Sequence, residues 1–68
     1  MQPFQQRVVE ERDELGIKLS RLRGFVEYNE NFRNLPIDEQ ERMMLQLQHM
    51  QAYHDVLIQR IKAFSGDG

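Results

Sequence analysis

An apolar stripe of helical spacing in the C-terminal half constrains the fold of this chain most. Every third or fourth residue there is apolar, which is typical of an amphipathic α-helix that buries one face. The stripe consists of Met43, Leu47, Met50, Leu57, Ile61 and Phe64. Polar residues interrupt its edge at intervals of seven, namely Gln46, Tyr53 and Arg60. We therefore expect a helix over residues 37–64 that follows Pro36.

A second stripe predicts a helix in the N-terminal half, over residues 3–28. Pro3 suits the first turn of a helix, where a backbone N–H is not needed. Glu11 and Lys18 lie inside the stripe, seven residues apart, and Gly16 weakens the helix by about 1 kcal/mol relative to Ala. The apolar members are Phe4, Val8, Leu15, Leu19, Leu22, Phe25 and Val26.

The segment between the two stripes predicts a turn. Three Asn within residues 29–34 favour local bonds between side chain and backbone, and Phe32 and Leu35 suit a short helical turn near 30–35. Two long helices joined in this way pack antiparallel, with neighbouring residue numbers that add to roughly 65. The predicted fold class is an all-α, antiparallel two-helix hairpin in one domain, residues 1–64, followed by a disordered tail, residues 65–68.

Size and composition favour a homo-oligomer. The chain has 68 residues and no cysteine, so a disulfide cannot support its small core. The apolar arc of the second helix, which includes Met44 and Ile58, is wider than one partner helix covers. We expect another copy of the chain to cover the excess.

Several function classes are disfavoured by the sequence. A net charge of −2 disfavours a general DNA-binding protein, and no apolar run is long enough to span a membrane. The N-terminus lacks a hydrophobic signal core, so the protein is expected to remain in the cytoplasm. No catalytic motif is present, so we expect neither enzyme activity nor a cofactor. His49 and His54 lie about 140° apart around a helix, so we expect no metal site.

The polar residues set into the two stripes have two interpretations. Glu11 and Lys18 could meet Gln46, Tyr53 and Arg60 in a buried network that fixes the register of the hairpin. The same residues could instead line a ligand site that another subunit completes, with nearby arginines forming an anion pocket in the oligomer. The candidate ligand-binding residues are Arg7, Glu11, Lys18, Arg21, Gln46, Tyr53 and Arg60.

A pattern spread over residues 5–62 resembles a family of short phage and prophage proteins, first catalogued from a crAss-like gut phage. The chain departs from that family at Pro36, where a capping Ser or Thr is usual, and at Gly16. The matching residues are Arg7, Glu11, Glu14, Leu15, Lys18, Leu22, Phe25, Phe32, Leu35, Glu39, Gln40, Gln46, Met50, Tyr53, Leu57, Arg60 and Ile61.

In size and hairpin form the chain is also similar to phage sponge proteins that defeat CBASS and Thoeris immunity. Those proteins are small helical hairpins that form hexamers and sequester cyclic oligonucleotides or cyclic ADP-ribose isomers at subunit interfaces. The resemblance implies a phage-encoded counter-defence protein that acts in the cytoplasm of an infected bacterial host, as a hexamer or another homo-oligomer. The alternative is a helical interaction module that binds a host or phage protein.

Overall fold

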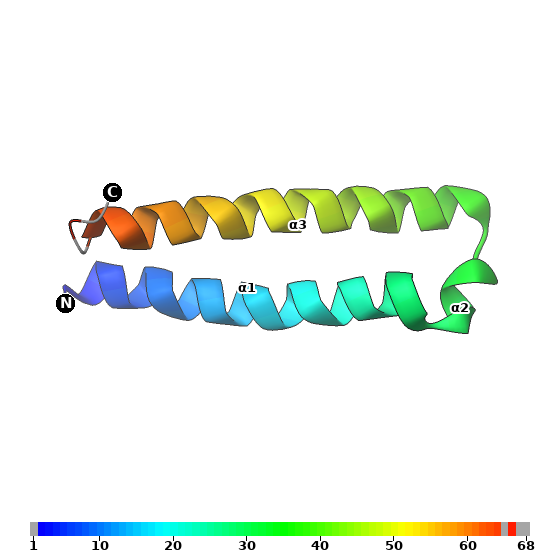
Figure 1. Cartoon of the computed structure of the whole chain (residues 1–68), viewed down its shortest axis with the longest axis horizontal. Helices are drawn as coiled ribbons and strands as arrows, with labels where there is room; N and C mark the ends of the chain where they lie inside the picture. The colour runs from blue at the N-terminus through cyan, green and yellow to red at the C-terminus, as the bar shows by residue number, and fades with distance from the viewer. Residues whose placement is uncertain (1, 65, 67–68) are drawn as a thin grey trace.

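The chain folds into a hairpin of two long helices, as predicted. The computed structural model describes residues 2–64 and residue 66. Helix α1 spans Pro3–Tyr28, the short helix α2 spans Glu30–Arg33 and helix α3 spans Ile37–Phe64. The molecule measures 45 × 16 × 15 Å, with α1 and α3 side by side and both termini at one end (Figure 1). The tail expected at 65–68 lies outside the described residues, apart from Gly66.

Side-chain hydrogen bonds fix the ends of the helices. The backbone N–H of Gln2 donates to Oε1 of Gln5 at 2.8 Å, which satisfies a free donor ahead of α1. Oδ1 of Asn29 accepts from the backbone N–H of Asn31 at 2.9 Å, as the Asn-rich segment predicted. Nε2 of Gln40 then donates to the carbonyl of Leu35 at 2.9 Å, which ties α3 to the turn.

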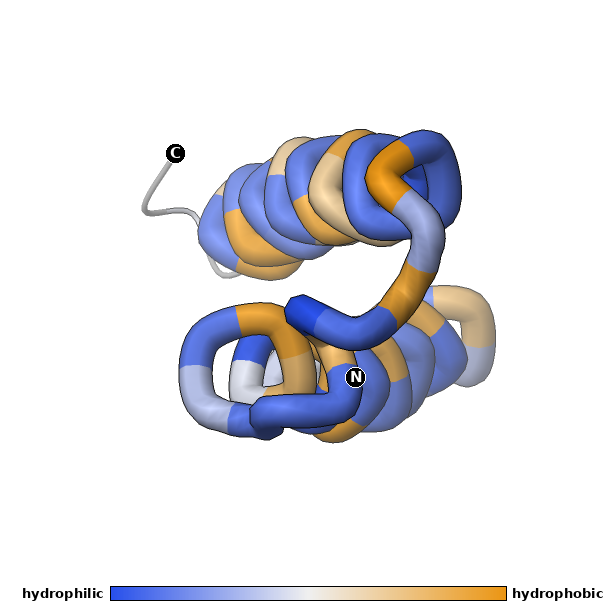
Figure 2. The backbone as a smooth tube through the Cα atoms, turned by 90° about the vertical axis from the view of Figure 1, so that its right-hand side faces the viewer, coloured by the Kyte–Doolittle hydropathy of each residue, from blue (hydrophilic) through white to orange (hydrophobic). Residues whose placement is uncertain are grey.

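A narrow apolar core holds α1 against α3. Its centre is formed by Val8, Leu15 and Leu57, and Leu57 is only 1% exposed. Figure 2 looks along the hairpin and shows apolar stretches where the two helices face each other. Partly buried Met50, Ile61 and Phe64 pack against this centre.

Edge-to-face aromatic pairs close the two ends of this core. At the open end, the rings of Phe4 and Phe64 are 5.8 Å apart at 82°. At the turn, Phe25 meets the buried Phe32 of α2 at 6.2 Å and 84°. Phe32 therefore plugs the hairpin end, as the sequence predicted.

The predicted register of the hairpin is wrong by about one helical turn. Contacting residue numbers add to 68 for Phe4 and Phe64 and to 70 for Gly16 and His54, rather than to roughly 65. The difference arises because α2 continues beyond the end of α1 and lies beneath the start of α3 (Figure 1). The first turns of α3 consequently cover α2, and α1 lies opposite later residues than expected.

Large apolar side chains remain exposed on this hairpin. Met44, Leu45, Tyr53 and Val56 of α3 are between 45% and 53% exposed, and Phe4 of α1 is 55% exposed. The expectation of an oligomer rested on a surplus of apolar surface on α3. The oligomer itself stays a prediction. Within residues 2–64, neither long helix is apolar enough to cross a membrane.

Truncation of the core should destabilise the hairpin strongly. Leu15→Ala or Leu57→Ala removes a buried side chain from a line of contact with few members, so each should lower the free energy of unfolding by about 2–5 kcal/mol. Leu45→Ala, at a position that is 53% exposed, should change it by less than about 0.5 kcal/mol. Urea unfolding followed by circular dichroism measures both, and equal losses would contradict the assigned core.

The two glycines of α1 should respond differently to alanine. A Cβ at Gly24 meets nothing within 4 Å, so Gly24→Ala should raise the free energy of unfolding by about 0.5–1 kcal/mol through helix propensity. A Cβ at Gly16 would lie 3.3 Å from Nε2 of His54, so the ring must shift and Gly16→Ala should gain less. The same unfolding experiment ranks the two variants, and a larger gain at Gly16 would contradict the packing of His54.

Candidate functional site

The polar residues set into the stripes point away from the contact between the two helices. In both helices the partly or fully buried positions lie four residues after a core residue, as Leu19 does after Leu15 and Ile61 after Leu57. Leu22, three residues after the buried Leu19, is partly buried, but four other positions three residues after a core residue are exposed. These are Glu11 after Val8, Lys18 after Leu15, Tyr53 after Met50 and Arg60 after Leu57.

The exposed positions of both helices share one face of the hairpin. Because both helices are right-handed and run in opposite directions, an equal rotation from the contact line reaches the same face in each. The opposite face obeys the same rule, since Arg23 and Gln51, each one residue after a stripe residue, are joined by a hydrogen bond across it. We call the shared positions the outward row. It comprises Phe4, Glu11, Lys18 and Phe25 of α1 and Gln46, Tyr53 and Arg60 of α3, and all of these are exposed except Phe25, which is half-buried against Phe32.

The buried network that was one interpretation of these residues is wrong. Among the described residues no polar or charged side chain is buried, and Glu11, Lys18 and Arg60 are all exposed. Gln46 only reaches Sδ of Met50 in its own helix, at 3.8 Å. The reason is the rotation of the helices, which turns the residues three positions after Val8, Leu15 and Leu57 outward and those four positions after them toward the other helix.

Four cations lack an ion-pair partner, two of them in the outward row and two beside it. Within residues 2–64, the ion pairs join Arg12 to Asp13 at 3.0 Å and Arg42 to Asp38 and Glu39 at 3.4 and 2.9 Å. Lys18 and Arg60 of the outward row take part in none of them. Arg7 and Arg21 precede core-stripe residues by one position, which places them at the outer edge of the same face, and they are also exposed and unpaired. The face therefore offers positive charge to an anion.

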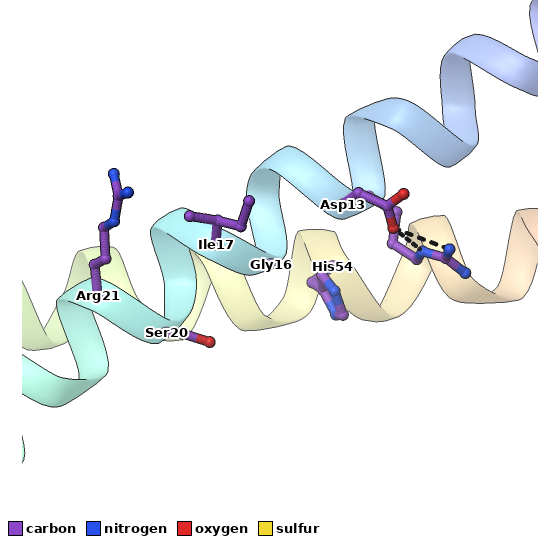
Figure 3. A pocket seen from close by; sticks show the side chains of 7 residues that line it. Asp13, Gly16, Ile17, Ser20, Arg21 and His54 are labelled. Carbon is purple, nitrogen blue, oxygen red and sulfur yellow. Dashed lines mark hydrogen bonds and ion pairs between the residues drawn. The ribbon is translucent and has the colours of Figure 1, made fainter.

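A shallow open hollow of about 590 Å³ lies mainly along α1, and His54 of α3 also lines it (Figure 3). Arg21 is the predicted site residue that it contains, and its side chain points away from that of His54. The guanidinium of Arg12 is already paired with Asp13. The hollow thus gathers no group of free cations, and we place the candidate site on the outward row. The hollow is lined by Arg12, Asp13, Gly16, Ile17, Ser20, Arg21 and His54.

Sequence reasoning missed the pairing of Gly16 with His54 that shapes this hollow. Gly16 was noted only as a weak position in the helix, although a glycine there leaves room for the ring of His54. The spacing of Gly16 and Ser20, two small residues four apart, was the available signal of a depression in the helix surface. Across the described residues, no group of three or more His, Asp or Glu is placed to hold a metal ion.

Comparison with known proteins identifies one family. Residues 2–63 match the family model described as Sequestin, which covers nearly the whole chain. The name of that family indicates a protein that sequesters another molecule. Searches of curated proteins and of solved structures find no match.

Substitution of the outward row should leave the stability of the free hairpin almost unchanged. Lys18→Ala and Glu11→Leu alter exposed side chains without a partner, so each should change the free energy of unfolding by less than about 0.5 kcal/mol. In a buried network, loss of one partner would have cost about 3–5 kcal/mol. Thermal unfolding of the single variants measures the difference, and a loss on the larger scale would restore the network interpretation.

Proposed function

Because the chain belongs to the Sequestin family, we propose that it is a non-catalytic protein that sequesters a nucleotide-derived immune signal. The signal is of the cyclic oligonucleotide or cyclic ADP-ribose type, and it is held at interfaces between subunits. In this proposal the protein is phage-encoded and acts against host defence in the cytoplasm of the infected bacterium. The observation that carries the proposal is the outward row with its unpaired cations.

The charges of this face suit the phosphates of such a ligand. Lys18 and Arg60 are exposed and have no ion pair within the described residues, and Arg7 and Arg21 flank them. A guanidinium binds phosphate oxygens through two parallel hydrogen bonds, and an ammonium provides a compact point charge. Since none of the four cations has an ion pair to break, binding of an anion requires no loss of an existing bridge.

The remaining groups of the row suit the other parts of a nucleotide. Tyr53 is 45% exposed and offers an aromatic face on which a base can stack. Gln46 carries both donors and an acceptor for the edge of a base, and the carboxylate of Glu11 accepts from an amino or hydroxyl group. Cations, an aromatic ring and polar groups on one face together favour a nucleotide over a simple anion.

A titration against a panel of cyclic dinucleotides, cyclic trinucleotides and cyclic ADP-ribose isomers tests the proposal. At least one member should bind at micromolar protein, and it should be recovered chemically intact after denaturation of the complex, as sequestration requires. Arg7→Ala and Arg21→Ala should each weaken binding by about tenfold or more, because each removes a charge-assisted bond.

Arg33→Ala is the matched control, because it removes the same charge from α2 at the far end of the hairpin. It should leave the affinity unchanged. Absence of binding by every member of the panel would overturn the proposal, and recovery of a cleaved product would assign an enzyme instead. Capture of a specific host or phage protein without binding of any small molecule would favour an interaction module.

A further inference from the structure

The outward row of α1 is complementary to itself. Its members Phe4, Glu11, Lys18 and Phe25 are each seven residues apart. An aromatic residue stands at each end of the row, and two residues of opposite charge stand between them, so the pattern is the same in both chain directions. If two copies of α1 lie antiparallel about a two-fold axis between Glu11 and Lys18, each Phe4 meets a Phe25 and each Glu11 meets a Lys18. A two-fold interface requires this kind of self-complementarity, since the same surface forms both sides.

A single hairpin leaves the charged centre of this row without a partner, although Phe25 at one end is half-buried against Phe32. Phe4 is 55% exposed although it contacts Phe64, and Glu11 and Lys18 are exposed and belong to no ion pair of the described residues. We propose that a second copy of the chain covers the row, with α1 antiparallel to α1 of the second copy and the two-fold axis passing near Glu14 and Leu15. Charge complementarity and the matched aromatic ends set this alignment.

The row of α3 fits the same axis independently. Contacts across the hairpin join residues whose numbers add to about 70, which places Tyr53 level with Lys18 and Arg60 level with Glu11. The axis that pairs Glu11 with Lys18 of the second copy therefore also brings Tyr53 opposite Arg60 of the second copy. A guanidinium over a tyrosine ring is a favourable cation–π contact. Nothing in the choice of the α1 alignment required this match.

The dimer creates an anion site that a single copy lacks. Arg7 and Arg21 are separated by 14 residues, about 21 Å along one helix, so they cannot bind one phosphate together. Across the two-fold axis, Arg7 of one copy lies opposite Arg21 of the other. Each dimer then has two sites, each with one arginine from each copy, while Glu14 lies near the axis, about 10 Å along the helix from either arginine. In this dimer Lys18, Tyr53 and Arg60 pair with the second copy, so the contacts to phosphate are made by Arg7 and Arg21. The ligand of each site is a phosphate or pyrophosphate group; its occurrence within a nucleotide rests on the proposed function.

Disulfide cross-linking tests the alignment, because the chain contains no cysteine. Glu11→Cys and Lys18→Cys proteins should each remain uncross-linked when oxidised alone and should form a disulfide dimer when mixed. The mixed dimer retains one Glu11–Lys18 pair, so the interface is not lost through the substitutions. Asp13→Cys mixed with Ser20→Cys is the matched control, since these exposed residues have the same spacing but lie on the other side of α1. They should not cross-link.

Two outcomes would overturn the alignment. One is the absence of any disulfide in the mixture of Glu11→Cys and Lys18→Cys. The other is a disulfide between Glu11→Cys and Arg60→Cys in its place, which would assign a two-fold axis parallel to the helices and put α1 on α3 of the second copy.

Mixing of arginine variants tests the shared anion site, with inorganic pyrophosphate as the titrant. Arg7→Ala and Arg21→Ala should each abolish binding, because either change removes one arginine from both sites of its dimer. An equal mixture should regain about a quarter of the parental sites, since half of the dimers are mixed and each mixed dimer keeps one intact pair. A mixture that binds no better than the separate variants would overturn the shared site.

The two proposals fail in distinguishable ways. A chain that cross-links and binds pyrophosphate as expected, but binds no member of the nucleotide panel, would overturn the proposed function and support the dimer. A chain that binds a nucleotide while it sediments as a monomer would overturn the dimer and the placement of the ligand between subunits, and it would support only the sequestration of a nucleotide.

Discussion

One line of apolar contact between two helices holds this structure together. Val8 and Leu15 of α1 meet Leu57 of α3, the most deeply buried side chain of the described residues. Most of the stability of a helix in a protein comes from the packing of its apolar face, so each long helix depends on the other to cover its apolar side. The chain has no cysteine and hence no disulfide that could replace this contact. Stability, register and the identity of the exposed residues all follow from where the line runs.

The position of that line decides the chemistry of the surface. The line of contact runs along the core residues and the residues that lie four positions after each of them in the sequence. Glu11, Lys18, Tyr53 and Arg60 are therefore turned outward. A charge in a dry interface needs a partner, whereas a charge on an open face remains hydrated and available. The hairpin thus keeps polar groups inside apolar stripes without burying them. The same rotation leaves Phe4 and Val56 largely exposed, which favours further association.

The proposed function and the proposed dimer meet on this outward face. Membership of the Sequestin family indicates sequestration, and the face supplies cations without partners, an aromatic ring and hydrogen-bonding groups. A flat face on one hairpin can surround little of a ligand, because a site of high affinity buries most of the surface of the molecule that it binds. Two copies joined through self-complementary rows would supply opposing walls, with Arg7 and Arg21 contributed by different subunits.

The sequence by itself determined both long helices and the hairpin. Periodicity identified the helices, and local features such as Pro3, Pro36 and the Asn-rich turn determined where they end. Periodicity also identified the polar residues that are out of place in an apolar stripe. Only the tertiary structure decided that they face outward. Neighbouring positions three and four after a core residue differ by 100° around the helix, and the broad stripes were compatible with either rotation. The register was likewise a tertiary matter, since α2 with its buried Phe32 occupies the space beneath the start of α3.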